Sequence, residues 1–252
     1  MDKIEKKWEY FGETNPYFAV STFDKFKSEN LDDAALVDFF ESGEEYVERI
    51  WQEIESNFQP NFKPRKAIDF GCGVGRITLP IAKRCETVTG IDISENMLKE
   101  ARQNSAKFGL NNVNFVKGDN DLTEITGKFD FIHSFIVFQH IKPEIGAAIF
   151  KKFVEMLSSG GIGVLHFTYF NNQPSLAQKI RFRIYRDFSW AYKLRNFIKK
   201  KDEHLIPMYL YDLNRLLLVL QENDCHKCQI RFSHHGVEGA LLFFQKGKET
   251  LY

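Results

Sequence analysis

The chain has 252 residues, of which 43% are hydrophobic, and its 34 lysines and arginines balance 34 aspartates and glutamates. This length suits one large α/β domain with an added segment, and the balanced charge gives no overall sign of a nucleic-acid or membrane partner. No apolar stretch is long enough to span a membrane, and the charged residues 1–7 do not resemble a signal sequence, so we expect a cytoplasmic protein.

Residues 1–60 are expected to form a helical prefix ahead of the main domain. Aromatic residues are frequent in 1–30, where Gly12 and Pro16 interrupt short helical pieces. Residues 31–40 and 44–57 each carry apolar side chains at helical spacing. We predict two helices there, separated at Ser42 and Gly43.

Residues 66–76 are the stretch around which the rest of the chain is organised. A short apolar run, expected to be a buried strand, leads into glycines at 71, 73 and 75 and then into a helix-like segment. Such a loop lets a ligand approach the backbone closely. The third glycine comes one position too early for a dinucleotide fingerprint, and residue 76 is Arg. Asp69, near the end of the strand, would repel a pyrophosphate but suit an ammonium or sulfonium group.

Two more strands are expected at 88–92 and 112–118. The first ends in Asp92, about twenty residues after the glycine loop, where a carboxylate can bind both hydroxyls of a ribose. Ser94 is placed to cap the helix that follows, and Gly109 to end it. A ribose-containing ligand with a cationic tail is therefore indicated.

The second half of the chain continues the alternation of strands and helices. A nearly continuous apolar strand at 129–135 suits the centre of a sheet, and a helix at 144–158 leads into a fifth strand. An insertion at 171–207 is longer than the usual α/β connection and rich in cations and aromatics. A helix at 208–223 and a closing hairpin at the sheet edge complete the pattern.

Four features in this order resemble the class I S-adenosylmethionine-dependent methyltransferases: the glycine loop at 69–75, Asp92, the step Gly118-Asp119-Asn120, and the fourth strand. The resemblance covers residues 65–170 best. It implies a Rossmann-like, doubly wound, seven-stranded, mostly parallel sheet with an antiparallel edge strand. The implied methyltransferase domain is 61–252, with the insertion at 171–207 as a helical lid, and the implied cofactor is S-adenosylmethionine.

The resemblance also implies which residues bind the cofactor. Ile93 and Met97 would flank an adenine ring, although Met97 fits a packed core position equally well. Asp119 can accept a hydrogen bond from the adenine amino group, while Asn120 can donate and accept. The backbone near Ser134 would lie by the methionine portion. The expected cofactor-binding residues are Asp69, Gly71, Cys72, Gly73, Gly75, Arg76, Asp92, Ile93, Met97, Asp119, Asn120 and Ser134.

On the acceptor side, the prefix of such enzymes often lies over the cofactor. Tyr10, Phe11 and Tyr17 are then lid candidates, unless they only pack the prefix onto the body. Gln139, after the fourth strand, would face the acceptor. The insertion, including Arg181 and Tyr185, could hold an anionic small molecule or contact an acidic partner or lipid surface; the alternative is an amphipathic helix pair with a solvated basic face.

Methyl transfer requires positioning and exclusion of water, and a general base only where the acceptor must lose a proton. His140 is the first candidate base, because a neutral imidazole can take a proton near pH 7; His133 and His166 are weaker candidates. No magnesium-binding acid cluster is evident, and Cys225 and Cys228 lack a second cysteine pair for zinc, so we expect no metal.

Motifs typical of nucleic-acid methyltransferases are missing from the sequence. We therefore expect transfer to a small molecule, with an oxygen acceptor on a sugar or on a phosphorylated or carboxylated metabolite. Two other functions stay open: a non-catalytic, cofactor-binding regulatory or assembly subunit, and a nicotinamide-dependent oxidoreductase, which the early third glycine and Asp69 oppose. A monomer and a homodimer are equally compatible with the sequence.

Overall fold

The computed structural model describes residues 3–171 and 206–247. Arg181, Tyr185 and nearly all of the predicted insertion lie outside these residues. None of the helices within these two ranges is long and apolar enough to cross a membrane.

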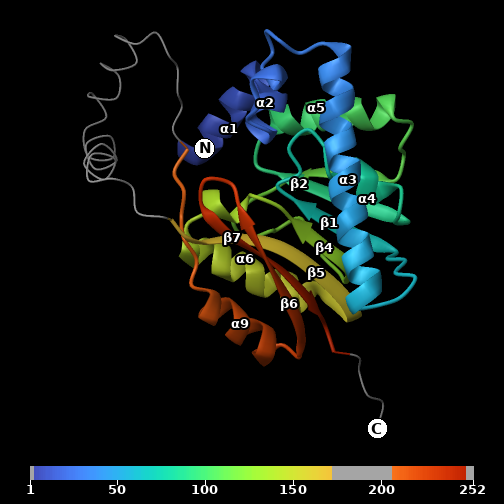
Figure 1. Cartoon of the computed structure of the whole chain (residues 1–252), viewed down its shortest axis with the longest axis vertical. Helices are drawn as coiled ribbons and strands as arrows, with labels where there is room; N and C mark the ends of the chain where they lie inside the picture. Colours follow the sequence, from blue (N-terminus) through green and yellow to red (C-terminus); the bar gives the residue numbers. More distant parts are fainter. Residues whose placement is uncertain (1–2, 172–205, 248–252) are drawn as a thin grey trace, which may run out of the picture.

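A seven-stranded sheet forms the centre of the molecule (Figure 1). Its strands are β1 (Lys66–Phe70), β2 (Thr87–Asp92), β3 (Val113–Lys117), β4 (Phe129–Ser134), β5 (Leu157–Phe170), β6 (Lys227–His234) and β7 (Glu238–Gln245). Across the sheet they follow the order β3-β2-β1-β4-β5-β7-β6. The pairs from β3 to β5 are parallel, and β7 is antiparallel to both β5 and β6. The antiparallel pairings therefore lie at one edge, as the sequence indicated.

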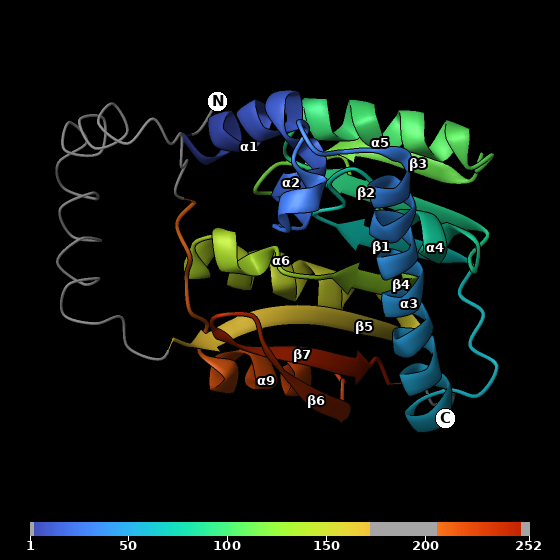
Figure 2. The same ribbon diagram turned by 45° about the horizontal axis from the view of Figure 1, so that its top comes forward.

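Helices cover both faces of the sheet (Figures 1 and 2). These helices are α3 (Asp33–Asn57), α4 (Thr78–Ala82), α5 (Glu95–Lys107), α6 (Pro143–Met156) and α9 (Leu213–Glu222). On one face, Ile54 of α3 and Ile81 of α4 pack with Phe131 of β4. On the other face, apolar residues of α6 and α9 pack with the side chains that alternate with these along the strands. This double coverage explains the continuous burial of β4.

Residues 33–57 form the single helix α3, so the prediction of two helices divided at Ser42 and Gly43 was wrong. A Cβ atom at Gly43 would lie 2.1 Å from the carbonyl oxygen of Arg76. Gly43 is required because α3 passes close to the glycine loop at this point. The helix is not interrupted at Gly43. The helix predicted from 208 begins later, at Leu213, where the Asp212 side chain accepts a hydrogen bond from the backbone of Asn214.

The prefix lies across the end of the sheet where β1 to β4 terminate. It contains α1 (Lys3–Thr14), α2 (Pro16–Val20) and the short 3₁₀ helix η1 (Asp24–Phe26). Helix α1 runs beside α5 (Figure 2). The Glu9 carboxylate accepts hydrogen bonds from the backbone N–H groups of Glu95 and Asn96, so α1 caps the N-terminus of α5. Gly12 permits this approach, since a Cβ there would lie 2.9 Å from the backbone nitrogen of Met97.

Candidate active site

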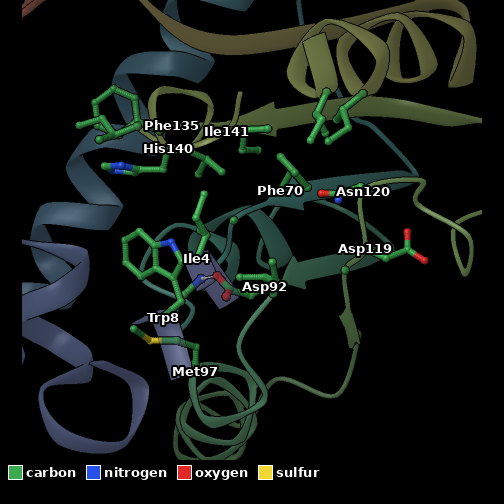
Figure 3. Close-up of a pocket in the computed structure, with 18 of the residues that line it drawn as sticks. Ile4, Trp8, Phe70, Asp92, Met97, Asp119, Asn120, Phe135, His140 and Ile141 are labelled. Carbon is green, nitrogen blue, oxygen red and sulfur yellow. Dashed lines mark hydrogen bonds between the residues drawn. The ribbon is translucent and has the colours of Figure 1, made fainter. Parts of the chain in front are cut away.

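A cavity of about 210 Å³ lies at the carboxyl ends of β1 to β4 (Figure 3). The strand order reverses between β1 and β4, and open α/β sheets bind their ligands at such a switch point. Gly71 and Gly73 line one side of the cavity, and Trp8 of α1 and Val20 of α2 line it from the prefix.

The glycine loop presents bare backbone to this cavity. The N–H groups of Gly71 and Cys72 donate to the Ile91 carbonyl oxygen at 2.7 and 2.9 Å, which ties the loop to β2. Gly73 has φ +52°, a conformation that side chains disfavour, and a Cβ there would lie 2.6 Å from Cγ2 of Val20. Any larger residue would fill the space between the loop and the prefix.

Asp92 joins the glycine loop to the start of α5. Its Oδ2 accepts from the Gly73 N–H and its Oδ1 from the Ser94 N–H, both at 2.9 Å. Burial raises the pKa of Asp92 to about 6, although these backbone hydrogen bonds oppose the shift. Each carboxylate oxygen keeps acceptor capacity, so the side chain can still receive two hydroxyl groups, as a ribose would offer.

Four other predicted cofactor residues also line the cavity: Ile93, Met97, Asp119 and Asn120. Met97 is only 1% exposed and therefore serves both as core and as cavity wall. The Asp119 carboxylate points away from the cavity (Figure 3). It accepts hydrogen bonds from the backbone N–H groups of Asp121 and Thr123. Asn120 is thus the side chain of this turn that is directed toward the cavity.

Asp69 and His133 form a separate buried group. Thr78 donates to Asp69 Oδ2 at 2.6 Å, His133 Nδ1 donates to Asp69 Oδ1 at 2.8 Å, and Tyr46 donates to His133 Nε2 at 3.1 Å. Both side chains lie on the α3 face of the sheet, because alternation along β1 and β4 places them with Ala67 and Phe131. Asp69 therefore does not face the cavity, and His133 has no lone pair free to act as a base in this arrangement.

The remaining predicted cofactor residues shape the loop without lining the cavity. Arg76 lies under α3, where Nη1 donates to Ser42 Oγ and the guanidinium stands 6.0 Å from the Phe39 ring. Cys72 is buried, and burial raises the pKa of its thiol. Gly75 supplies a turn at φ +91°. Ser134 donates from Oγ to the Phe70 carbonyl oxygen and ties β4 to β1.

The backbone just after Ser134 does reach the cavity. Phe135 and Ile136 both line it, and Ile136 has φ +60°. A positive φ is unusual for a β-branched residue and stores strain, which is most often found at functional sites.

His140 lines the cavity at its other end, in the 3₁₀ helix η2 (Phe138–His140). The Trp8 ring packs against it edge-on at 5.4 Å (Figure 3). Its Nδ1 donates to the Pro207 carbonyl oxygen at 3.1 Å, and its Nε2 accepts from the Gln139 amide at 3.0 Å. Burial lowers the pKa of His140, so the ring is neutral near pH 7. Gln139 was predicted to face the acceptor, but it is 5% exposed and does not line the cavity.

His166, the weaker candidate base, lies outside the cavity lining. It is fully buried on β5, and its Nε2 lies 2.8 Å from Ser233 Oγ. Its Nδ1 has no hydrogen-bond partner among the described residues, and burial lowers its pKa to about 3.

The prefix contributes different aromatic residues from those predicted. Tyr10 and Phe11 do not line the cavity, and Tyr17 is buried with its hydroxyl donating to Glu100. Ile4 and Trp8 line it instead. They are four residues apart, which puts them on one helical face, whereas Tyr10 follows Trp8 by about 200° around the helix. This i, i+4 spacing was the available signal in the sequence.

Residues 67–161 match the family model of the methyltransferase domain. This part of the chain is a methyltransferase domain, and the sheet has the fold of the class I S-adenosylmethionine-dependent methyltransferases. S-adenosylmethionine is therefore the cofactor that the site fits, and a dinucleotide is not favoured.

Curated relatives match this methyltransferase domain over part of their length. The chain is 38% identical over 69 residues to a probable cobalt-precorrin-6B C(15)-methyltransferase (decarboxylating) of Methanocaldococcus jannaschii, which covers 27% of this chain and 37% of the relative. It is 35% identical over 71 residues to a 23S rRNA (uracil(1939)-C(5))-methyltransferase of Alkalilimnicola ehrlichii, covering 26% of this chain and 16% of the relative. The chain thus spans little more than a third of the first relative and less of the second.

Solved structures of methyltransferases have a similar fold. Magnesium protoporphyrin IX methyltransferase from Synechocystis PCC 6803, with bound S-adenosylmethionine, aligns over 98% of this chain and 99% of that chain, with a TM-score of 0.60 and 17% identity. At this identity the likeness establishes the fold of the methyltransferase and leaves its acceptor open.

Proposed function

We propose that this protein transfers the methyl group of S-adenosylmethionine to an oxygen atom of a small molecule, without a metal ion. The observation that carries the proposal is the cavity at the β1–β4 switch point, with Gly73 and Asp92 on one side and His140 on the other. When bound, the cofactor supplies a methyl carbon activated by a sulfonium. The protein has to align the acceptor with that carbon and exclude water.

The side chains around the cavity divide these tasks. Asp92 binds hydroxyl groups of the ribose, and the bare loop at Gly71 and Gly73 lets the rest of the cofactor lie against the backbone. Trp8 and Val20 cover the cavity and keep water out. We propose that residues 1–60 act in this way as a lid on the domain formed by 61–252.

His140 is the proposed general base. When an acceptor hydroxyl attacks, its O–H bond breaks and the proton goes to Nε2, which carries the lone pair of the neutral ring. Lys142 also lines the cavity and offers a cation for an anionic acceptor such as a phosphorylated or carboxylated compound.

The covered cavity favours a small molecule over a nucleic-acid strand. Because the name of one relative specifies rRNA, an RNA oligonucleotide belongs among the acceptors to be tested. The four cysteines, all within the described residues, are free thiols, which supports a cytoplasmic location.

One observation favours the second candidate, a regulatory subunit that binds the cofactor without using it. Both ring nitrogens of His140 are already hydrogen-bonded, to Gln139 and Pro207. An acceptor would have to replace the Gln139 hydrogen bond before the base could act.

Cofactor binding can be tested by calorimetric titration with S-adenosylhomocysteine, with NAD and NADP as controls. We expect binding of S-adenosylhomocysteine alone. Asp92→Ala should weaken it by about 1–3 kcal/mol, because two hydroxyl groups lose a charged acceptor. Asp121→Ala, an exposed carboxylate near the same edge of the sheet, should leave the affinity unchanged. Equal effects of the two substitutions would contradict the ribose assignment.

Methyl transfer can be tested with labelled S-adenosylmethionine and a panel of sugars, sugar phosphates, aromatic carboxylates and an RNA oligonucleotide. Label in a small molecule supports the proposal, whereas label in the RNA overturns the acceptor assignment. Tight S-adenosylhomocysteine binding with no transfer to any member favours the regulatory subunit.

A further inference from the structure

A chain of hydrogen bonds runs from the cavity to the surface through side chains that are distant in sequence. His140 Nε2 lies 3.0 Å from the Gln139 amide nitrogen, and Gln139 Oε1 lies 3.1 Å from His235 Nε2. His235 is exposed in the turn between β6 and β7, whereas Gln139 is 5% exposed. The chain therefore links a cavity residue to solvent through a buried amide.

The Pro207 carbonyl group determines the donor and the acceptor in each of these hydrogen bonds. The Pro207 oxygen can only accept, so His140 Nδ1 must carry a proton. In a neutral ring Nε2 then has the lone pair and receives a hydrogen bond from the Gln139 NH₂ group. This leaves Gln139 Oε1 facing His235, which must donate from Nε2. The positions of these groups thus assign the tautomers of His140 and His235.

The same side chains can also satisfy His140 after it has gained a proton. The new Nε2–H needs an acceptor, and Gln139 provides one if its amide turns over and presents Oε1. Its NH₂ group then faces His235, whose ring accepts once its proton has moved from Nε2 to Nδ1 by exchange with water. An amide beside an imidazole can make this change, whereas an apolar side chain can serve neither state.

We propose that Gln139, anchored by His235, is the positioning residue for His140 Nε2 in both protonation states: it donates a hydrogen bond to Nε2 of the neutral ring and accepts one from Nε2–H after methyl transfer has protonated the ring. This inference rests on the proposed function, in which the acceptor's O–H bond breaks and a bond from that hydrogen to Nε2 forms. The proton leaves to water after the methylated product has gone, which returns His140 to its neutral form.

The surroundings of His140 are consistent with this role. Trp8 packs on it from α1, and the Pro207 carbonyl oxygen accepts a hydrogen bond from its Nδ1–H. Among the described residues, His235 is the titratable side chain that acts on its charge. His235 in turn faces His234 and Glu238. Burial and the charge of His235 both lower the pKa of His140, whereas the hydrogen bond to Pro207 raises it. A hydrogen bond that the protonated Nε2 donates to Gln139 would oppose desolvation in the same way as the bond to Pro207.

The test uses the full-length protein saturated with S-adenosylhomocysteine and needs no acceptor. Long-range ¹H–¹⁵N spectra of the imidazole rings, recorded from pH 5 to 8, report the tautomer and pKa of each histidine, and His140→Gln assigns the His140 signals. We expect the Nδ1–H tautomer for His140 in the wild type. Gln139→Leu should lower its pKa by about one unit, because hydrogen bonds to charged groups are stronger than those to neutral ones. Gln139→Glu should raise it.

A second variant guards against a misfolded Gln139→Leu protein. His235→Ala changes an exposed side chain, so it should fold, but it removes both the anchor of Gln139 and a charge that lowers the pKa of His140. His235→Gln also removes the charge and keeps a hydrogen-bonding side chain, so the pKa of His140 should be lower in His235→Ala than in His235→Gln. The matched control is His234→Ala. His234 is the neighbouring residue, which pairs with Glu238 and takes no part in the hydrogen bonds between His140, Gln139 and His235. It should leave the His140 signals unchanged.

Two results would overturn the inference. One is an Nε2–H tautomer for His140 in the wild type. The other is a His140 pKa that Gln139→Leu leaves unchanged and that is the same in His235→Ala and His235→Gln. Failure of the wild-type protein to bind S-adenosylhomocysteine is a different outcome. It would contradict the proposed function, and the histidine tautomers would then be measured by the same spectra in the free protein.

Discussion

Asp92 shows how one residue connects the parts of the cofactor site. Its carboxylate holds the Gly73 N–H on one side and the Ser94 N–H at the start of α5 on the other. The cost is desolvation, which outweighs these hydrogen bonds and raises the pKa of Asp92 to about 6. The ionised form that binds hydroxyl groups is therefore complete only above that pH.

S-adenosylhomocysteine binding should weaken in mildly acidic solution. Since the pKa of Asp92 in the free protein is about 6, protonation as the pH falls through this value removes the hydroxyl acceptor. The dissociation constant at pH 5 should be about tenfold higher than at pH 7. Calorimetry over this range measures it, and Asp92→Asn, which cannot ionise, should give a nearly flat profile. A flat wild-type profile would contradict the prediction.

At the scale of elements, α3 is positioned by its contact with the glycine loop. Gly43 lies in the middle of the helix and directly over the Arg76 carbonyl, and Tyr46, one turn further, donates to His133 on β4. The helix therefore contacts the backbone of the loop and the buried polar group beneath the sheet's central strands.

Gly43→Ala should destabilise the protein. In an ordinary helix interior this change stabilises by up to about 1 kcal/mol, because alanine has the higher helix propensity. Here the new Cβ would lie 2.1 Å from a backbone oxygen, so α3 has to move away from the loop. We expect the free energy of unfolding in urea to fall by roughly 1–3 kcal/mol. Val37→Ala, an exposed position in the same helix, should have little effect, and a gain in stability for Gly43→Ala would refute the packing argument.

Polar contacts help to hold helix α1 to α5. Glu9 accepts from Glu95 N, Asn96 N and Ser94 Oγ, and these hydrogen bonds together lower its pKa despite partial burial. Because Trp8 is the adjacent residue, the attachment of Glu9 also places the cover of the cavity.

Glu9→Ala should loosen α1 without unfolding the domain. The N-terminus of α5 keeps its N-cap Ser94 but loses the hydrogen bonds to Glu9. Amide hydrogens in α1 should exchange with solvent several-fold faster, since such capping interactions contribute about 1 kcal/mol. Hydrogen exchange read by mass spectrometry measures the effect peptide by peptide. Glu13→Ala changes an exposed carboxylate of the same helix and serves as control. Identical exchange in both variants would show that Glu9 does not hold the lid.

At the scale of the whole molecule, the cavity is lined by segments that are far apart in the sequence and come together only in the native state. The glycine loop, the end of β4 and the prefix each contribute to its lining. A ligand bound there interacts with the native form alone and should stabilise the entire domain.

Saturation with S-adenosylhomocysteine should therefore raise the melting temperature. At a hundred times the dissociation constant, the gain is about 2.7 kcal/mol, or roughly 5–10 °C for a chain of this size. Differential scanning calorimetry measures the shift, with NAD at the same concentration as control. An equal shift with NAD would contradict the choice of cofactor.

Several predictions made from the sequence depended on order along the chain and agree with the structure. The apolar run at 66–70, the glycines after it and the next strand ending in Asp92 are local patterns, and local backbone preferences decide them. Their order then implied a doubly wound sheet, because parallel strands need crossover helices. The closing hairpin likewise placed the antiparallel pairings at one edge.

Other features of the site required the tertiary structure. Asp69 and His133 lie on different strands, and only the register of β1 with β4 puts them side by side, on the face that α3 covers. Gly43 indicated a helix break in the sequence and is instead a point of close approach.

By itself, the sequence determined the sheet, the glycine loop and Asp92, because neighbouring residues create them. Only the folded chain could show that Trp8 covers the cavity and that Gln139 meets His235, 96 residues away. Such contacts depend on which surfaces become buried together, and no local preference along the chain encodes them.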